Sequence, residues 1–173
     1  MRKLVVRPAV GDDLPVLRDI EWASGQRYRE YGLDHVADDE PASVEELSRY
    51  ASEGRAWVAV GNADQPIGYI LVDVIDGVGH IEQVSVAPDW QGQGVGRALI
   101  EHAEAWAVSR GVPALTLTTF GHIPWNRPLY EHLGFRVLSP DQISPGVQDL
   151  RDTEAQHGLD PDFRVVMRLD LQA

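Results

Sequence analysis

The feature that most constrains the fold is a glycine-rich loop, residues 91–97, between two regular elements. In residues 80–86 apolar and polar side chains alternate, as expected of a strand. From Val95 onward apolar residues recur at helical spacing until Gly111 and Pro113, which predict that a long helix ends near residue 110. Glycine occupies every second position of the loop: Gly92, Gly94 and Gly96. A helix that begins in this way presents free backbone N–H groups, and glycine lets an anion such as phosphate approach them.

Two common nucleotide-binding motifs do not fit this loop. A dinucleotide-binding GxGxxG motif, counted from Gly92, would need glycine where Arg97 stands, and no early βαβ unit is predicted. A P-loop would need the residues GK[ST], which are absent. Two interpretations therefore stay open from these residues: a loop that binds a different phosphorylated ligand, or a structural turn that binds none.

The rest of the chain predicts interleaved strands and helices. The expected strands are residues 4–7, 56–60, 67–74, 80–86, 115–119, 135–138 and 163–171. The expected helices are one capped by Asp12 or Asp13 and ending near Gly25, one that begins with a Ser43–Glu46 capping box and runs through Tyr50, and residues 95–110 and 127–133. Residues 139–162, with three prolines, are predicted to be a long connection.

Links of hairpin length join the second, third and fourth expected strands. The predicted fold class is therefore α/β (α+β), with a mixed, mainly antiparallel sheet of about seven strands and about four flanking helices. A length of 173 residues predicts a single domain, residues 1–173.

Composition excludes several classes of function. There are no cysteines, which rules out disulfides, thiolate metal sites and a cysteine acyl-enzyme, and the six histidines form no HExxH motif, so no metal is expected. A net charge of −12 argues against nucleic-acid binding and suits a cationic partner such as an amine, although it also serves solubility alone. No apolar run reaches the roughly 18 residues that span a membrane, and no signal peptide is recognised, so a cytoplasmic location is expected.

Several segments resemble the GCN5-related N-acetyltransferases (GNATs). The loop sequence QGQGVG, residues 91–96, matches that family's Q/R-x-x-G-x-G/A signature. Residues 86–90 (VAPDW) resemble the family's exit from strand four, and residues 129–135 (LYEHLGF) its LYExxGF segment, at the family's spacing. These landmarks cover residues 79–136. The resemblance implies acetyl transfer from acetyl-coenzyme A (acetyl-CoA), with strands four and five splayed around its pantetheine arm.

By this resemblance, the loop amides hold the pyrophosphate of the coenzyme, and main-chain groups of two strand residues run along pantetheine. The implied coenzyme-binding residues are Val84, Val86, Gln91, Gly92, Gln93, Gly94, Val95, Gly96, Arg97 and Asn126. Many relatives place an asparagine six residues before the helix tyrosine, where this chain has Pro124; Asn126 is the substitute candidate. Arg127 is a further candidate for a phosphate contact, and a solvated surface arginine is its alternative interpretation.

Three residues are candidates for the proton transfers. Tyr130 stands at the family's general-acid position and would protonate the departing thiolate; its alternative role is packing. His80 and Glu82 lie two apart on one strand face, where the family places its base, acting directly or through water. An amine with a pKa of about 10 must be deprotonated before it attacks. Either residue has a structural role as its alternative.

The acceptor side is predicted from aromatic and acidic residues. Tyr28, Tyr31, Phe120 and Trp125 are candidates for the pocket walls, and Asp38, Asp39 and Glu40 for attracting a cation. Three functions follow: acetylation of a small-molecule amine, acetylation of a protein lysine or N-terminus, or coenzyme binding without catalysis. A monomer and a homodimer are both left open.

Overall fold

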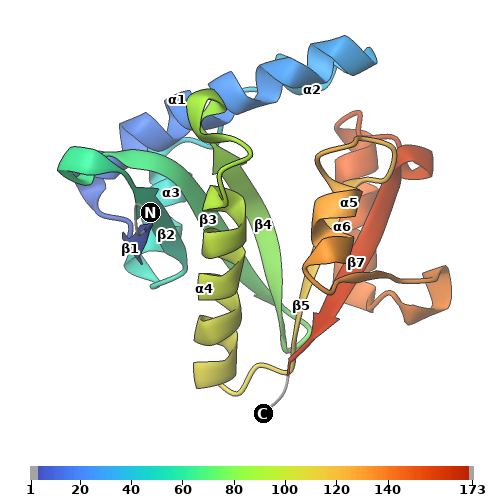
Figure 1. Cartoon of the computed structure of the whole chain (residues 1–173). Coiled ribbons are helices and arrows are strands. Elements are labelled where there is room, and N and C mark those ends of the chain that lie inside the picture. Colours follow the sequence, from blue (N-terminus) through green and yellow to red (C-terminus); the bar gives the residue numbers. More distant parts are fainter. Residues whose placement is uncertain (1–3, 172–173) are drawn as a thin grey trace. The chain divides into compact units, whose positions relative to one another are not determined.

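The computed structural model describes residues 4–171 (Figure 1). Backbone contacts divide them into two compact units, described separately below. The first unit contains residues 4–72 and 82–103, and the second contains residues 73–81 and 104–171. Three regular elements, β3, β4 and α4, cross the boundary between the units. Among the residues described, no helix is both long enough and apolar enough to cross a membrane.

The strands form a seven-stranded sheet in the order β1-β2-β3-β4-β5-β7-β6. They are β1 (Val5–Pro8), β2 (Ala56–Val60), β3 (Pro66–Ile75), β4 (Val78–Val86), β5 (Ala114–Phe120), β6 (Arg136–Val137) and β7 (Arg164–Asp170). The β1–β2, β2–β3, β5–β7 and β6–β7 pairs are antiparallel, whereas β4 pairs with β5 in parallel, Gly79 opposite Leu115 and His80 opposite Thr116. The predicted mixed, mainly antiparallel α/β sheet is confirmed.

The helices are α1 (Leu14–Gly25), α2 (Asp34–Ala37), α3 (Val44–Ser52), α4 (Val95–Ser109), α5 (Arg127–His132) and α6 (Pro145–Gln156). The cap of α3 is as predicted, because the Ser43 side chain accepts a hydrogen bond from the Glu46 N–H at 3.1 Å. Asp13 is the N-cap residue of α1, as predicted, but its side chain makes no capping hydrogen bond. The Asp13 carboxylate instead accepts from the Val10 N–H at 2.8 Å and pairs with Arg7 at 2.8 Å, so it fastens the chain before the helix.

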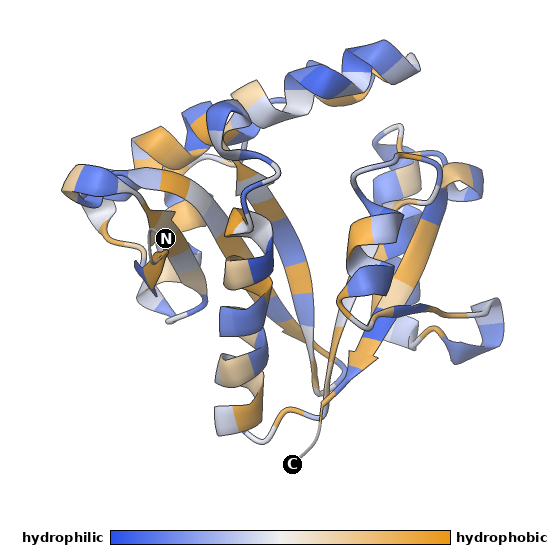
Figure 2. Ribbon diagram, viewed as in Figure 1, coloured by the Kyte–Doolittle hydropathy of each residue, from blue (hydrophilic) through white to orange (hydrophobic). Residues whose placement is uncertain are grey.

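In the first unit, helices cover both faces of β1–β3. Tyr69 packs into a cluster with buried residues of α1 and α3, among them Leu17 and Leu47. Gly68, its neighbour on the strand, faces the other side, where a Cβ would lie 3.0 Å from Val95 of α4. Figure 2 shows hydrophobic and hydrophilic residues alternating along α1 and α4, as expected of helices with one face on a sheet.

The second unit shows where the predicted long connection is wrong. Residues 139–162 contain the 12-residue helix α6, whose Val147 packs against Val166 of β7. Val147 is the buried residue of this helix, and most of its other side chains are polar, so the sequence carries little helical periodicity. Ser144 and Pro145 mark its start, because proline is well placed in the first turn of a helix.

Candidate active site

The glycine loop lies in the first unit, between β4 and the 15-residue α4. Gly92 and Gly94 have φ angles of 76° and 83°, a region that favours glycine. A Cβ built at either position would meet no atom within 4 Å, so the space in front of both residues is open. Gly96 also has room, with Val86 at 3.8 Å from its would-be Cβ. The loop therefore exposes main chain at the positive end of a long helix.

Side chains of the loop hold the loop itself. The Gln91 Nε2 donates to the Val86 carbonyl at 3.1 Å, and the Gln93 Nε2 donates to the Asp89 carbonyl at 2.9 Å. The Arg27 Nη1 donates to the Gln91 Oε1 at 3.3 Å. With both glutamines engaged in this way, the groups left for a ligand are backbone amides. The residues present fit a phosphate group, because open glycines and a helix N-terminus are what an anion needs.

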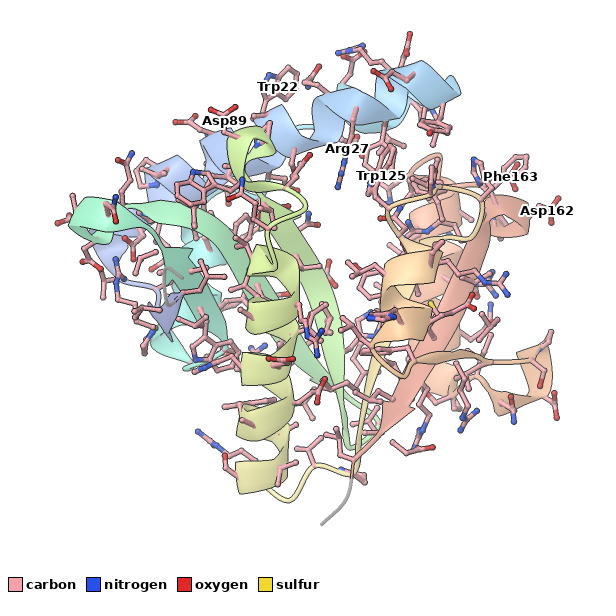
Figure 3. The ribbon with its side chains drawn as sticks, in the orientation of Figure 1. Trp22, Arg27, Asp89, Trp125, Asp162 and Phe163 are labelled. Atoms are coloured by element: carbon pink, nitrogen blue, oxygen red, sulfur yellow. The ribbon has the colours of Figure 1, made fainter. Side chains whose placement is uncertain are left out.

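Arg27 is a residue of this region that the sequence did not predict. It belongs to a short 3₁₀ helix, Gln26–Tyr31, after α1, and its half-buried side chain reaches across 64 positions of sequence to the first residue of the loop. Figure 3 labels it, and the side chain projects away from the helix. No spacing rule connects two such distant positions, so the sequence contains no signal for this contact.

The two arginines predicted to contact phosphate each pair with a carboxylate on their own helix. The Arg97 Nε lies 2.8 Å from the Glu101 Oε1, and Arg127 pairs with Glu131 at the same i,i+4 spacing. Both pairs are solvent-exposed, where such an interaction contributes little stability and is easily exchanged for another anion. Val84 and Val86 are half-buried on β4, and the side chain of Val95 is buried against the sheet.

Tyr130 and Asn126 are brought together in the second unit. Asn126 is the N-cap residue of α5, and its carbonyl accepts the Tyr130 N–H at 3.2 Å. The Tyr130 side chain is 8% exposed and meets the Phe135 ring edge-on, with centroids 5.9 Å apart. The Phe135 N–H in turn donates to the Tyr130 carbonyl at 3.0 Å. The LYExxGF segment thus folds back on itself around the tyrosine.

His80 and Glu82 lie two apart on β4 but differ in exposure. His80 is 1% exposed, and its Nδ1 lies 2.8 Å from the Thr116 Oγ1. Burial lowers the pKa of His80 from 6.5 to about 4, against an opposing effect of the nearby Glu154 and Asp73 carboxylates. The imidazole is therefore neutral near pH 7. Glu82, by contrast, is solvent-exposed.

The residues predicted for the acceptor pocket are divided between the units. Tyr28 and Tyr31 belong to the 3₁₀ helix of the first unit, half-buried and exposed respectively. In the second unit Phe120 is buried, with the Arg164 guanidinium 4.7 Å from its ring centroid, and Trp125 is half-buried (Figure 3).

The acidic cluster predicted to attract a cation is partly neutralised within the first unit. Asp38 pairs with Arg29, and Glu40 lies 3.6 Å from Arg18. Asp39, between them, is exposed. Within residues 4–171, no group of three or more histidine, aspartate or glutamate side chains is arranged to hold a metal ion.

Comparison with known proteins assigns the family. Residues 16–135 match the sequence profile of the Acetyltransferase (GNAT) family. The chain belongs to the GNAT family. It is 31% identical over 111 residues to the peptidyl-lysine N-acetyltransferase YjaB of Salmonella typhimurium, which covers 64% of this chain and 70% of that protein. This membership makes the protein an acyltransferase, as predicted, and sets aside coenzyme binding without catalysis.

Two further acetyltransferases are similar to this chain, one in sequence and one in fold. The chain is 35% identical over 91 residues to the aminoglycoside N(6')-acetyltransferase type 1 of Stenotrophomonas maltophilia, over 46% of this chain and 58% of that protein. The PaiA N-acetyltransferase of Thermoplasma acidophilum, solved in complex with coenzyme A, has a TM-score of 0.72 at 16% identity and covers 98% of this chain and 99% of its own. That similarity shows a shared fold.

Proposed function

We propose that this GNAT enzyme transfers the acetyl group of acetyl-CoA to the primary amine of a small molecule by direct attack in a ternary complex. The observation that carries the proposal is the open glycine loop at the start of α4, with free space before Gly92 and Gly94. The backbone amides of residues 92–97 would hold the pyrophosphate, and main-chain groups of Val84 and Val86 would lie along pantetheine. Coenzyme A bound in the PaiA structure supports the same donor here.

The chain's own residues would manage two protons. An ammonium group must lose a proton before its nitrogen attacks, and the departing thiolate gains one. Glu82 is the better candidate for the base because it is exposed and can exchange protons with water. His80 is buried, held by Thr116 and neutral, which suits a positioning role on the same strand. Tyr130 would donate the proton to the thiolate sulfur, as its position in the LYExxGF segment implies.

The match to residues 16–135 includes parts of both compact units, which supports the prediction that the chain is one domain. Arg27 joins the proposed coenzyme site as a positioning residue, because it holds the Gln91 side chain that is bonded to the end of β4.

A protein lysine is the second candidate acceptor. It is favoured by the similarity to YjaB, which is named a peptidyl-lysine acetyltransferase. The aminoglycoside acetyltransferase, at similar identity, favours a small molecule. The net charge of −12 suits a polycationic amine of either kind.

Release of free thiol from acetyl-CoA, followed across aminoglycosides, polyamines, simple amines and lysine peptides, tests the proposal. We expect a polycationic small molecule to give the highest kcat/KM. A lysine peptide that exceeds every small amine would establish the second candidate instead. No thiol release above the hydrolysis background with any amine would contradict acetyl transfer to nitrogen.

The base is tested by the pH dependence of the same reaction. The double variant with His80→Ala and Glu82→Gln should lose rate at neutral pH and recover it toward the pKa of the amine, since only amine already deprotonated in solution would react. If Glu82 is the base, Glu82→Gln alone should reproduce most of this change and His80→Ala much less. A double variant whose profile overlays that of the wild type would exclude both residues, and His122 would be examined next.

A further inference from the structure

A groove of about 500 Å³ lies in the first unit outside the glycine loop. Its walls are one face of α1, the turn between β2 and β3, and the short 3₁₀ helix Pro88–Trp90 that precedes the loop. Val16, Ile20 and Ala23 line it from α1, at the spacing of one helix face. This volume is within the range of pockets that hold drug-sized ligands. The name α1 groove is used for it below.

The walls of the α1 groove combine an apolar and aromatic surface with polar residues of the β2–β3 turn. Ile20 and Ile67 are buried residues of its lining. The Trp90 ring lies along one wall, 3.6 Å from where a Cβ at Gly61 would stand. An apolar or aromatic body would therefore find matching surface inside the groove.

The charged residues that line the groove are all negative. Asp19 and Asp89 are the charged residues in its lining, both are exposed, and no lysine or arginine lines it. Within residues 4–171 neither carboxylate enters an ion pair, although other exposed carboxylates do, such as Asp38 with Arg29. Two carboxylates that line the same groove as the Trp90 ring are complementary to an organic ammonium group.

We propose that the α1 groove binds a small organic cation whose ammonium group is attached to an apolar or aromatic body. The ammonium group lies between Asp19 and Asp89, and the body contacts Trp90 and the α1 face. This site is distinct from the proposed coenzyme site, because its lining ends at Trp90 and includes none of residues 91–97. It goes beyond the proposed function, since acetyl transfer does not require it.

The two sites share one structural support. The Gln93 side chain of the glycine loop donates to the Asp89 carbonyl at 2.9 Å, so an occupant of the groove touches the turn that holds the loop. We therefore expect the cation and coenzyme A to bind together, each changing the affinity of the other by a modest factor.

Three probes of one shape test the proposal: phenethylammonium, neutral phenethyl alcohol and anionic hydrocinnamate. Two-dimensional amide NMR of the whole chain follows the backbone N–H signals of residues 61–65, 67, 87, 89 and 90 during each titration, because the two prolines of these segments have no N–H. Phenethylammonium should shift these signals saturably, phenethyl alcohol should bind at least about 10-fold more weakly, and hydrocinnamate should not bind. Added salt should weaken the binding of phenethylammonium but not that of phenethyl alcohol.

Two variants separate charge from shape. Asp19→Asn with Asp89→Asn should weaken phenethylammonium binding at least about 10-fold and leave phenethyl alcohol unchanged. Ala23→Leu should block both by filling the groove. Asp12→Asn with Glu45→Gln removes the same charge from exposed positions outside the groove and should change neither.

Failure of this proposal is distinguishable from failure of the proposed function. The proposal is overturned if phenethylammonium gives no saturable shift up to about 10 mM, if the alcohol binds as well as the ammonium, or if the control variant loses as much affinity as the groove variant. Coenzyme A should still raise the melting temperature of the Asn variant. A wild type that binds phenethylammonium but not coenzyme A would contradict the proposed function and leave the groove site standing.

Discussion

The two segments that carry the GNAT motifs are held in opposite ways. The glycine loop is exposed and has empty space in front of Gly92 and Gly94. Its two glutamine side chains form hydrogen bonds with the backbone that precedes it. The segment around Tyr130 is packed, with Tyr130 and Asn126 both buried. In the proposed function, recognition by the first segment would rest on main chain, whereas chemistry in the second would rest on the Tyr130 side chain. Substitutions should accordingly affect binding in one segment and turnover in the other.

The largest effect is expected from Gly94→Val. A side chain at a φ of 83° is strained by about 1–2 kcal/mol, and it also occupies the open space where we place the pyrophosphate. Coenzyme A should no longer raise the melting temperature of this variant. Gly54→Val is the matched control, because Gly54 has a φ of 71° with equal space and lies outside the loop. If the Gly94→Val protein binds coenzyme A normally, the glycine loop does not bind the pyrophosphate through its main chain.

Tyr130→Phe should leave coenzyme binding intact and lower kcat by roughly 10- to 1,000-fold, because the ring still packs on Phe135 but has no proton to donate. Steady-state kinetics measure kcat, and a separate coenzyme titration measures binding. Tyr50→Phe, at a buried tyrosine of α3, should preserve kcat. If kcat is unchanged in the Tyr130→Phe variant, Tyr130 has a packing role and is not the proton donor.

The buried His80 should make the free energy of unfolding depend on pH. The folded state keeps it neutral down to a pKa of about 4, whereas the unfolded chain takes up a proton near 6.5. The unfolded state thus binds more protons between these values, so this contribution to stability is complete above about pH 6.5 and is lost as pH falls toward 4.

Denaturant unfolding at about pH 7 and about pH 4.5 measures it, and His80→Gln should lose about 2 kcal/mol of the difference between the two conditions. Replacing the exposed His132 with Gln controls for the loss of a histidine. If the His80→Gln protein keeps the full pH dependence, the imidazole is not held neutral.

The smallest effect is expected from Arg27→Gln. Loss of its hydrogen bond to Gln91 should cost about 1 kcal/mol in holding the loop, which corresponds to a rise of about five-fold in the Kd of coenzyme A. Calorimetric titration measures this directly. Arg29→Gln, two residues away and paired with Asp38 at the surface, should not change the Kd. Equal effects from both variants would mean that net charge matters rather than support of the loop.

Regular elements with strong periodicity were predictable almost to the residue. Residues 56–60 form β2 as expected, and α4 begins at Val95. Helix α6 was missed because its sequence is mostly polar and its stability depends on a few contacts such as that of Val147 with β7. The partner of the Asp13 carboxylate was not predictable, because an aspartate before a helix serves equally well as the partner of an arginine, and sequence does not show Arg7 nearby.

The site was predictable in its local parts. The glycine loop and the buried tyrosine segment follow from contiguous motifs. The contact of Arg27 with Gln91, the bond of His80 to Thr116 and the burial of Phe120 depend on residues distant in sequence, so local patterns could not reveal them. The α1 groove is a feature of the same kind, assembled from three separate segments.

Gly68 sets the depth at which the helix lies on its sheet. A methyl group there would stand 3.0 Å from both the Ser85 carbonyl and Val95, at the first turn of α4, and would push that turn outward. The residues that face the open space, Gly92 and Gly94, directly precede this turn, so a position near the start of β3, distant in sequence from the loop, helps to fix where the loop amides lie. A larger residue in place of Gly68 would therefore change the affinity for the proposed coenzyme although every residue of the signature motif is kept.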